Sequence, residues 1–405
     1  MKKLHKLLAV LIASGAVAHA QVEPAATGPA SRPIGRSLQY SLGYKQSAEF
    51  GGALGDWDTS AVNGDLHYSN GVQRLPFNVD YLGAYTWTLS GPSYYTGLSQ
   101  SMWMTQGFIQ RHWRVTLTDG LNYRPQPKNS FLFGVPGTGG GSLPSNEQSI
   151  LTIGTHTVYN NVSGSVDLDV GSSHALSFGG GEALLRYPDG NGLNTDSAQA
   201  SAGFATRLNA RNSVSGQYLY SHFFYPDYSF SFDTHTIFFS NDRQWNRKLS
   251  TSLAAGPEFV RSSNSAILPG ATKLAVNSFL DYKRRSEAFT LRYNRATRGG
   301  SGYLFGSEID SVTGILSATF RRRTTAGIIG AYSRTTGVKS AQAINSVITG
   351  AEATRLLGRY LTLVANFDVI DQMTHYKPQS GVLNHQVESL TFGIKYSPRG
   401  APLPQ

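Results

Sequence analysis

The chain of 405 residues contains no cysteine, which excludes disulfide bonds, thiolate metal sites and a lipid-modified cysteine. Charged residues are scarce as well, at 15% of the chain. No segment approaches the run of roughly 20 apolar residues that a transmembrane helix needs. The fold must therefore be stabilised by hydrogen bonding and packing, without covalent cross-links.

The N-terminus has the pattern of an export signal. Three lysines within the first six residues precede an apolar run at residues 7–13, and the small residues Ala18 and Ala20 follow. This order of a basic, an apolar and a small-residue segment predicts a cleaved secretory signal peptide at residues 1–20. Residues 21–36 are rich in Pro, Ala and Gly, so we interpret them as a flexible periplasmic linker.

Aromatic and apolar residues alternate with more polar ones over long stretches, and residues 77–87 show this best. One set there is Phe77, Val79, Tyr81, Gly83, Tyr85 and Trp87, and the other is Asn78, Asp80, Leu82, Ala84 and Thr86. A period of two predicts a β-strand with one apolar and one wetter face.

The same pattern predicts about eighteen strands, within a range of 16–20, and no convincing amphipathic helix. We therefore expect an all-β fold, a transmembrane antiparallel up-and-down β-barrel over residues 37–397, followed by a C-terminal tail at 398–405. The expected strands are 37–45, 60–69, 75–88, 93–105, 108–123, 148–171, 174–187, 196–208, 212–225, 229–241, 247–259, 272–283, 286–296, 310–321, 324–334, 342–356, 359–371 and 386–397.

Tight and longer connections are expected to alternate along the chain, as they do between the periplasmic turns and outer loops of such barrels. One of the tight links is expected near Gln106, and the alternation holds only if 148–171 is one long strand. Strands 108–123 and 148–171 then form a tall hairpin that projects outside. An even strand number places both termini in the periplasm.

In this pattern the chain resembles the porin-type outer-membrane barrels. The last expected strand, with Leu390, Phe392, Ile394 and Tyr396 on one face, is similar to the terminal strand that barrel-assembly machinery binds, although Ser397 and eight further residues follow it. The resemblance implies an integral outer-membrane protein in contact with lipid and lipopolysaccharide. It leaves open whether the barrel forms a homo-oligomer.

The formal net charge of +10 suggests an anion channel or a nucleic-acid binder, but the position of the charges argues against both. Without the three signal lysines, 32 basic residues face 25 acidic ones. Basic residues gather in the tight links, for example at Arg284, Arg285 and Arg359, where anionic headgroups would lie. We therefore expect no nucleic-acid partner.

The expected strands carry more acidic than basic residues on their inward faces. We predict that the pore-lining residues include Asp80, Asp233, Asp281, Asp368, Arg114 and Arg292. Carboxylates in excess in a water-filled lumen attract cations, which predicts a weakly cation-preferring channel. The alternative is that these charges pair across the lumen and leave little selectivity.

The longest expected loop, 124–147, contains several glycines and the apolar residues Phe131, Leu132 and Phe133. One interpretation is a constriction loop that folds into the barrel mouth. The other is a mobile loop whose aromatic side chains pack on a neighbouring strand.

The function predicted from these features is passive diffusion of small hydrophilic solutes across the outer membrane. Two alternatives stay open: an export channel for polysaccharide or another envelope polymer with a periplasmic partner, and a plugged barrel with a surface or adhesion role. His156 and Asn160 share a face, but no serine stands out as their partner, so we expect no enzyme. The sequence predicts neither a cofactor nor a metal site.

Overall fold

A computed structural model describes residues 37–51, 56–91, 96–124, 156–190, 192–300, 304–320, 323–338, 343–374, 385–398 and 401–402. These residues form a closed antiparallel barrel of eighteen long strands, each paired with its neighbours in the chain. The barrel closes where β1 pairs with β18, from Leu42 opposite Tyr396 to Phe50 opposite Glu388. The all-β fold and the strand number of the expected barrel are thus confirmed.

The eighteen strands are 12 to 15 residues long. They are β1 (Ser37–Phe50), β2 (Trp57–Ser69), β3 (Phe77–Ser90), β4 (Gly97–Ile109), β5 (Trp113–Arg124), β6 (Thr157–Val170), β7 (His174–Arg186), β8 (Thr195–Asn209), β9 (Asn212–Tyr225), β10 (Phe230–Gln244), β11 (Leu249–Ser262), β12 (Ala271–Lys283), β13 (Glu287–Arg298), β14 (Ser307–Phe320), β15 (Thr324–Gly337), β16 (Ala343–Leu357), β17 (Leu361–Thr374) and β18 (His385–Tyr396).

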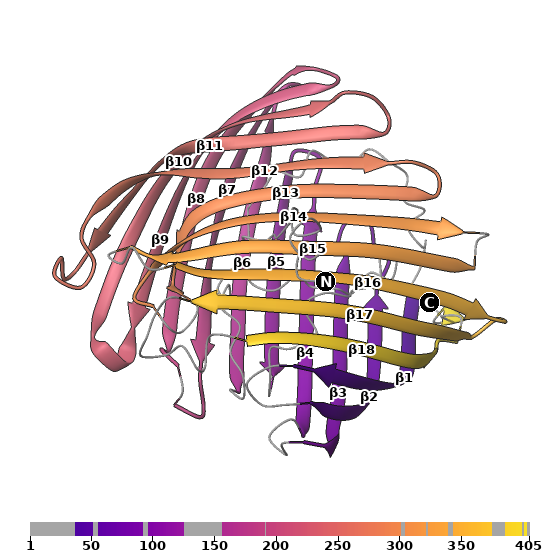
Figure 1. The fold of residues 1–405 in the computed structure, drawn as a ribbon. Coiled ribbons are helices and arrows are strands. Elements are labelled where there is room, and N and C mark those ends of the chain that lie inside the picture. The colour runs from indigo at the N-terminus through magenta and orange to yellow at the C-terminus, as the bar shows by residue number, and fades with distance from the viewer. Residues whose placement is uncertain are drawn as a thin grey trace.

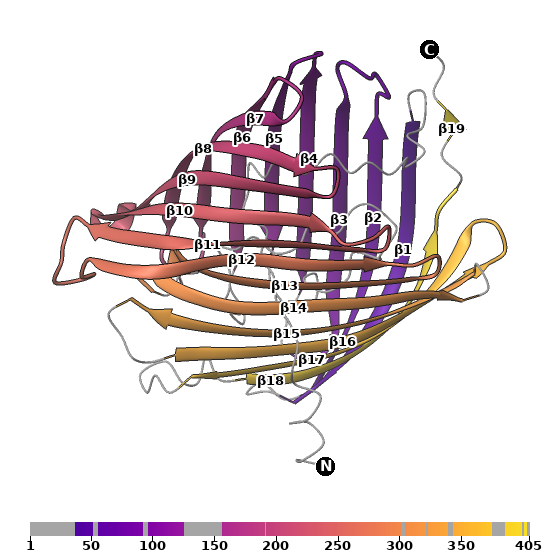
Figure 2. The same cartoon turned by 90° about the horizontal axis from the view of Figure 1, so that it is seen from above.

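The strands are strongly tilted, as closure into a barrel requires. In Figure 1, β2–β5 run upright while β13–β18 lie across the view, because opposite walls of a tilted barrel cross. Figure 2 shows the first strands, in indigo, beside the last ones, in yellow. A short strand, β19 (Ala401–Pro402), pairs with the first residues of β1, so part of the expected C-terminal tail joins the sheet. Among the described residues, no helix is long and apolar enough to cross a membrane.

The two ends of the barrel differ in their connections. The end where β1 starts and β18 finishes carries the tight connections, and we call it the turn end; the opposite end is the loop end. Asparagine side chains shape several tight turns. Oδ1 of Asn246 accepts hydrogen bonds from the backbone N–H groups of Lys248 (2.8 Å) and Leu249 (3.1 Å), and Asn209 does the same for Arg211 (2.9 Å). Such side-chain-to-backbone bonds favour a turn over a continued strand.

The tight link expected near Gln106 was wrong. β4 continues past Gln106 to Ile109, and the turn lies at 110–112, because Gln106 keeps the alternation of the outer face between Met104 and Phe108. β6 begins at Thr157, so the first part of the expected strand 148–171 is not confirmed; residues 148–155 lie outside the described residues. The signal peptide, the linker and the top of the expected tall hairpin also lie outside them.

Candidate functional site: the barrel interior and its loop end

The two faces of the barrel wall carry different side chains. On β1, Tyr40, Leu42 and Tyr44 point outward and are 51%, 57% and 45% exposed. Ser41 and Ser47 alternate with them, point inward and are buried. The register carries this division from strand to strand, because directly paired residues share a face. The wall is therefore apolar outside and polar inside.

Aromatic side chains on the outer face gather near both ends of the barrel. At the turn end they are Trp113, Tyr282, Phe320, Tyr360 and Tyr396, and toward the loop end they are Tyr85, Trp87, Tyr218, Tyr293 and Tyr332. Exposed aliphatic residues such as Leu117, Leu253 and Ile328 lie between the two sets. Two aromatic girdles around an apolar band are the outer face expected of a barrel in a bilayer.

Five of the six residues predicted to line the pore lie on the inner face. Asp80 is hydrogen-bonded to His67, with 2.6 Å between Oδ1 and Nδ1. Asp281 accepts a 2.6 Å hydrogen bond from the hydroxyl of Thr290, and Asp368 is buried opposite Ser389. The other two are Arg114, opposite Asp167, and Arg292, opposite Phe279. They come from different parts of the wall and form no single cluster.

The predicted inward position of Asp233 was wrong. On β10, Phe230, Phe232 and Thr234 are buried inside, and Asp233 shares the outer face with the exposed Ile237. The sequence misleads here because aromatic residues usually mark the lipid-facing side, whereas these pack inside the barrel mouth.

On the outer face, Asp233 belongs to a polar group near the loop end. Its Oδ1 is 2.7 Å from Nδ1 of His222 and accepts a 2.8 Å hydrogen bond from the hydroxyl of Tyr220. His235 contacts Tyr218 in the same way, with 2.7 Å between ring nitrogen and hydroxyl. This group lies level with the outer-face aromatics of the loop end, where the interface of a bilayer would be.

One section of the inner wall is acidic. Glu49 on β1, Glu352 on β16 and Asp368 on β17 are 4%, 5% and 3% exposed. Within the described part of the chain, neither carboxylate oxygen of Glu352 has a hydrogen-bond partner. The nearby ammonium of Lys395 instead bonds Asp65 at 2.8 Å. Lys45 on β1 interacts electrostatically with Asp368 and Glu49, so this section combines three buried carboxylates with one ammonium group.

Sequence reasoning missed Glu352. It lies opposite Asn366 and therefore shares the inner face with Asp368. Small residues surround it on both faces of β16, in the run Thr349, Gly350, Ala351 and Ala353, so hydrophobic alternation gives no signal there. Only the register between β16 and β17 places Glu352 on the same face as Asp368. This register cannot be derived from the sequence of β16 alone, because it requires the strand pairing to be known.

A cavity of about 800 Å³ opens on the inner side of the turn end, below β3–β5. Its charged lining residues are Arg74, Arg111 and Arg114, all exposed, and Asn78 adds an amide. The backbone there is held in place, because the N–H of Ile109 donates a 2.8 Å hydrogen bond to the carbonyl of Arg74. The turn end of the lumen therefore carries positive charge on this side.

At the loop end, the tip of the β13–β14 hairpin folds toward the inner face of the wall. The carboxylate of Glu258, on the inner face of β11, accepts hydrogen bonds from the backbone N–H of Thr297 at 3.0 Å and from its hydroxyl at 2.6 Å. Thr297 is fully buried, and Ala296 and Arg298 beside it are 4% and 7% exposed. Three consecutive buried residues show that this tip is covered on both faces.

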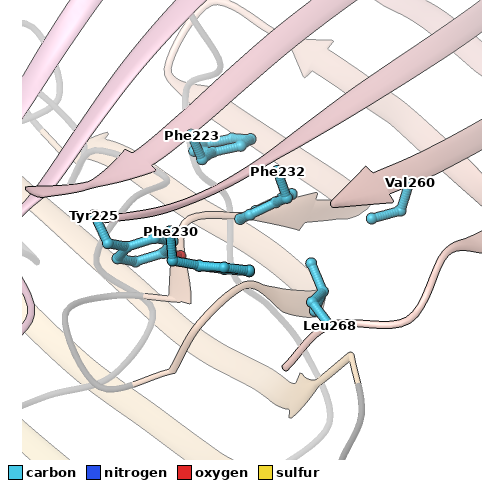
Figure 3. Packing of buried hydrophobic residues seen from close by; sticks show 6 residues of the cluster. All are labelled: Phe223, Tyr225, Phe230, Phe232, Val260 and Leu268. Carbon is cyan, nitrogen blue, oxygen red and sulfur yellow. The ribbon is translucent and has the colours of Figure 1, made fainter. Parts of the chain in front are cut away.

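The connection of this hairpin is held by a cluster of buried, mostly aromatic residues from the inner faces of β9–β11 and from the β11–β12 connection. Figure 3 shows its members, which are Phe223, Tyr225, Phe230, Phe232, Val260 and Leu268. The hydroxyl of Tyr225 donates to the carbonyl of Gly299 and accepts from the N–H of Gly306, each at 2.8 Å. The ring of Phe305 lies edge-on to Tyr225, with 5.2 Å between centroids. The described residues of the hairpin connection are thus bonded to the inner side of the wall at β9–β11.

The hairpin is a different element from the predicted constriction loop. Phe131, Leu132 and Phe133 lie outside the described residues, so their role stays a prediction. The sequence signal for the hairpin is the run of aromatic residues at 223–232. If all aromatic residues of these strands faced the lipid, the aromatic residues that point inward in this run could not be explained.

Comparison with protein-family models and with curated proteins found no match. Among solved structures, the chain is similar to OpdQ of Pseudomonas aeruginosa, with 12% identity and a TM-score of 0.45 over 90% of this chain and 97% of that one. It is also similar to OccAB4 of Acinetobacter baumannii, with 9% identity, a TM-score of 0.46 and coverage of 90% and 98%. A third is the outer membrane protein OpdK of P. aeruginosa, with 11% identity, a TM-score of 0.44 and coverage of 89% and 99%.

Proposed function

We propose that this chain is an integral outer-membrane channel for passive diffusion of small hydrophilic solutes. The observation that carries the proposal is the reversed polarity of the wall, with exposed aliphatic and aromatic side chains outside and serine, threonine and charged residues inside. A closed barrel leaves no unpaired strand edge in lipid, and one of eighteen strands encloses an aqueous channel. The outer face would contact lipid and lipopolysaccharide.

We further propose that the turn end lies in the periplasm, together with both termini of the barrel. Porin-type barrels have short periplasmic turns and long outer loops. The turn end has the shorter connections here, such as 110–112 and 171–173, whereas the loop end has 125–156. Insertion in this orientation would use the barrel-assembly machinery, with β18 as its terminal strand.

The proposed selectivity is a weak preference for cations. Asp80, Asp281 and Asp368 remain the proposed pore-lining carboxylates, and Glu352 joins them in place of Asp233. Arg114 and Arg292 remain the proposed pore-lining cations. The acidic section of β16, β17 and β1 supports the preference, since it has three carboxylates, Lys45 is the basic residue that interacts electrostatically with Asp368 and Glu49, and neither carboxylate oxygen of Glu352 has a hydrogen-bond partner among the described residues.

Swelling of liposomes that contain the refolded protein tests the channel directly. We expect uptake of small neutral sugars at rates that fall with sugar size, because a water-filled lumen selects by width. A correctly folded barrel that admits none of these sugars would contradict the channel and favour the plugged barrel with a surface role.

A further inference from the structure

Three arginine side chains from separate elements meet at the cavity of the turn end. Arg74 belongs to the connection between β2 and β3, Arg111 to the turn between β4 and β5, and Arg114 to the start of β5. All three are exposed and line the same cavity of about 800 Å³. Like charges that share a cavity repel one another, so this arrangement becomes favourable when an anion binds between them.

The other polar residues of the cavity offer hydrogen-bond donors and no negative charge. None of the eleven described residues that line it is acidic. The side-chain amides of Gln73, Asn78 and Gln110 and the hydroxyl groups of Thr105 and Thr116 can all donate to an anion. A cation would find no carboxylate among these residues, whereas an anion would find donors from several strands.

The three guanidinium groups are available to a ligand. Within the described part of the chain, the ion pairs that arginines form belong to Arg186, Arg284 and Arg295. Asp167 on β6 lies opposite Arg114 and interacts with it electrostatically, but it does not line the cavity. Three arginines against this one aspartate leave two positive charges to be balanced.

The backbone around the cavity is fixed by contacts within the protein. The N–H of Ile109 donates a 2.8 Å hydrogen bond to the carbonyl of Arg74, and the N–H of Gly107 donates one of the same length to Pro76. A Cβ atom at Gly107 would lie 2.7 Å from Cγ of Pro76, so glycine allows the β2–β3 connection to pack this closely on β4. A frame that is already ordered lowers the entropic cost of binding.

We propose that this cavity binds the phosphoryl group of small phosphorylated solutes. A phosphate monoester carries a charge of about −1.5 to −2 at neutral pH and three acceptor oxygens, which matches two unbalanced charges and three arginines. A carboxylate has one charge and two oxygens, so one bidentate guanidinium would already satisfy it. The inference deepens the proposed channel function and rests on it.

The size and place of the cavity indicate which phosphorylated compounds fit. Its volume lies within the range of about 300–1,000 Å³ that is usual for small-molecule sites, so an organic group fits beside the phosphate. The cavity opens on the inner side of β3–β5, and the barrel wall therefore separates it from the headgroups of the surrounding lipid. A soluble phosphorylated solute, such as a sugar phosphate, is the expected ligand.

Calorimetric titration of the refolded protein in a phosphate-free detergent solution tests the site. The probes are inorganic phosphate, glucose 6-phosphate, glucuronate and glucose. We expect binding of both phosphates, weaker binding of glucuronate and none of glucose. Failure of both phosphates to bind would overturn the site. Equal affinity for glucuronate and glucose 6-phosphate would overturn its assignment to a phosphoryl group.

A pair of matched variants assigns the binding to the cavity. Arg111→Gln removes one guanidinium group, and we expect it to weaken phosphate binding about tenfold or more, as loss of a hydrogen bond to a charged group does. Arg359→Gln is the control, because Arg359 is an exposed arginine of the same barrel end but lies in the turn between β16 and β17. Equal weakening by the two substitutions would assign the binding to the general charge of the turn end and overturn the site.

Conductance recordings on the same samples separate this inference from the channel function. A barrel that binds phosphate and never conducts would contradict the channel and leave the phosphate site in place. A barrel that conducts and binds neither phosphate would overturn the site alone. The folded band on a gel shows in each case that the variant has formed the barrel.

Discussion

Gly256 on β11 allows the main chain of β10 to pass close by. A Cβ atom at this position would lie 1.7 Å from the carbonyl oxygen of Ile237, a distance that backbone atoms cannot accommodate without moving. Pro257 follows and lacks the N–H group that a ladder needs. The pairing between β10 and β11 is accordingly interrupted between Thr236 and Phe239.

We therefore predict that Gly256→Ala destabilises the barrel by about 1–3 kcal/mol or more, the range found for overpacked sites. The measurement is the temperature at which the folded band on a gel is lost. Gly216→Ala is the control, because nothing lies within 4 Å of a Cβ there. Equal melting of the two variants would mean that β10 and β11 do not approach as described.

The outward position of Asp233 leads to a second prediction at this scale. Asp233→Asn should leave the reversal potential under a KCl gradient unchanged, because its charge lies outside the lumen and beside His222. Asp80→Asn and Asp368→Asn should each move the reversal potential toward zero, since each removes a carboxylate from the inner wall. A larger effect of Asp233→Asn than of Asp80→Asn would contradict the assignment of faces.

Among the elements, the β13–β14 connection depends on one hydroxyl group. Tyr225→Phe removes both hydrogen bonds to Gly299 and Gly306 and leaves two buried backbone groups unsatisfied, at a cost of about 1–3 kcal/mol. We expect faster hydrogen exchange at the Gly306 amide. Tyr228→Phe, an exposed neighbour that also contacts Phe305, should leave this exchange unchanged.

The connection between β7 and β8 should respond to acid. Asp189 accepts a 2.9 Å hydrogen bond from the backbone N–H of His156 and also contacts its ring, and these bonds lower the pKa of Asp189 below its usual value. A carboxyl group with a lowered pKa stabilises the folded state at pH values above the ordinary carboxyl range. This stabilisation is lost as the pH falls through the lowered pKa.

We therefore expect the backbone around His156 to exchange hydrogen faster only at pH values below the ordinary carboxyl range. Hydrogen exchange measured over an acid series checks this. Asp189→Asn should already show the faster exchange at neutral pH. A transition in the unsubstituted protein at pH values above the ordinary carboxyl range would contradict the role assigned to Asp189.

Strand number and order were predictable from sequence because alternation with a period of two is a local signal. β3 and β18 show it over most of their length, with aromatic residues on one face. On β9 and β10, aromatic residues lie on the inner face instead of the outer one. They do so because they pack against the β13–β14 connection, which lies 70 or more residues away in the chain. The in-folded hairpin and the face of Asp233 therefore could not be derived from local pattern alone.

At the scale of the whole molecule, the barrel combines an apolar exterior with a polar interior of uneven charge. The acidic section of β16, β17 and β1 and the arginine-lined cavity at the turn end lie on different parts of the wall. A solute crossing the lumen would meet both signs of charge, which fits a weak rather than a strong preference for cations.

Single-channel recording of the refolded chain in a planar lipid bilayer tests the central claim most directly. We predict stable conductance steps, with a reversal potential under a KCl gradient that has the sign of a cation preference. A folded, membrane-inserted barrel that shows no steps would contradict the proposed channel.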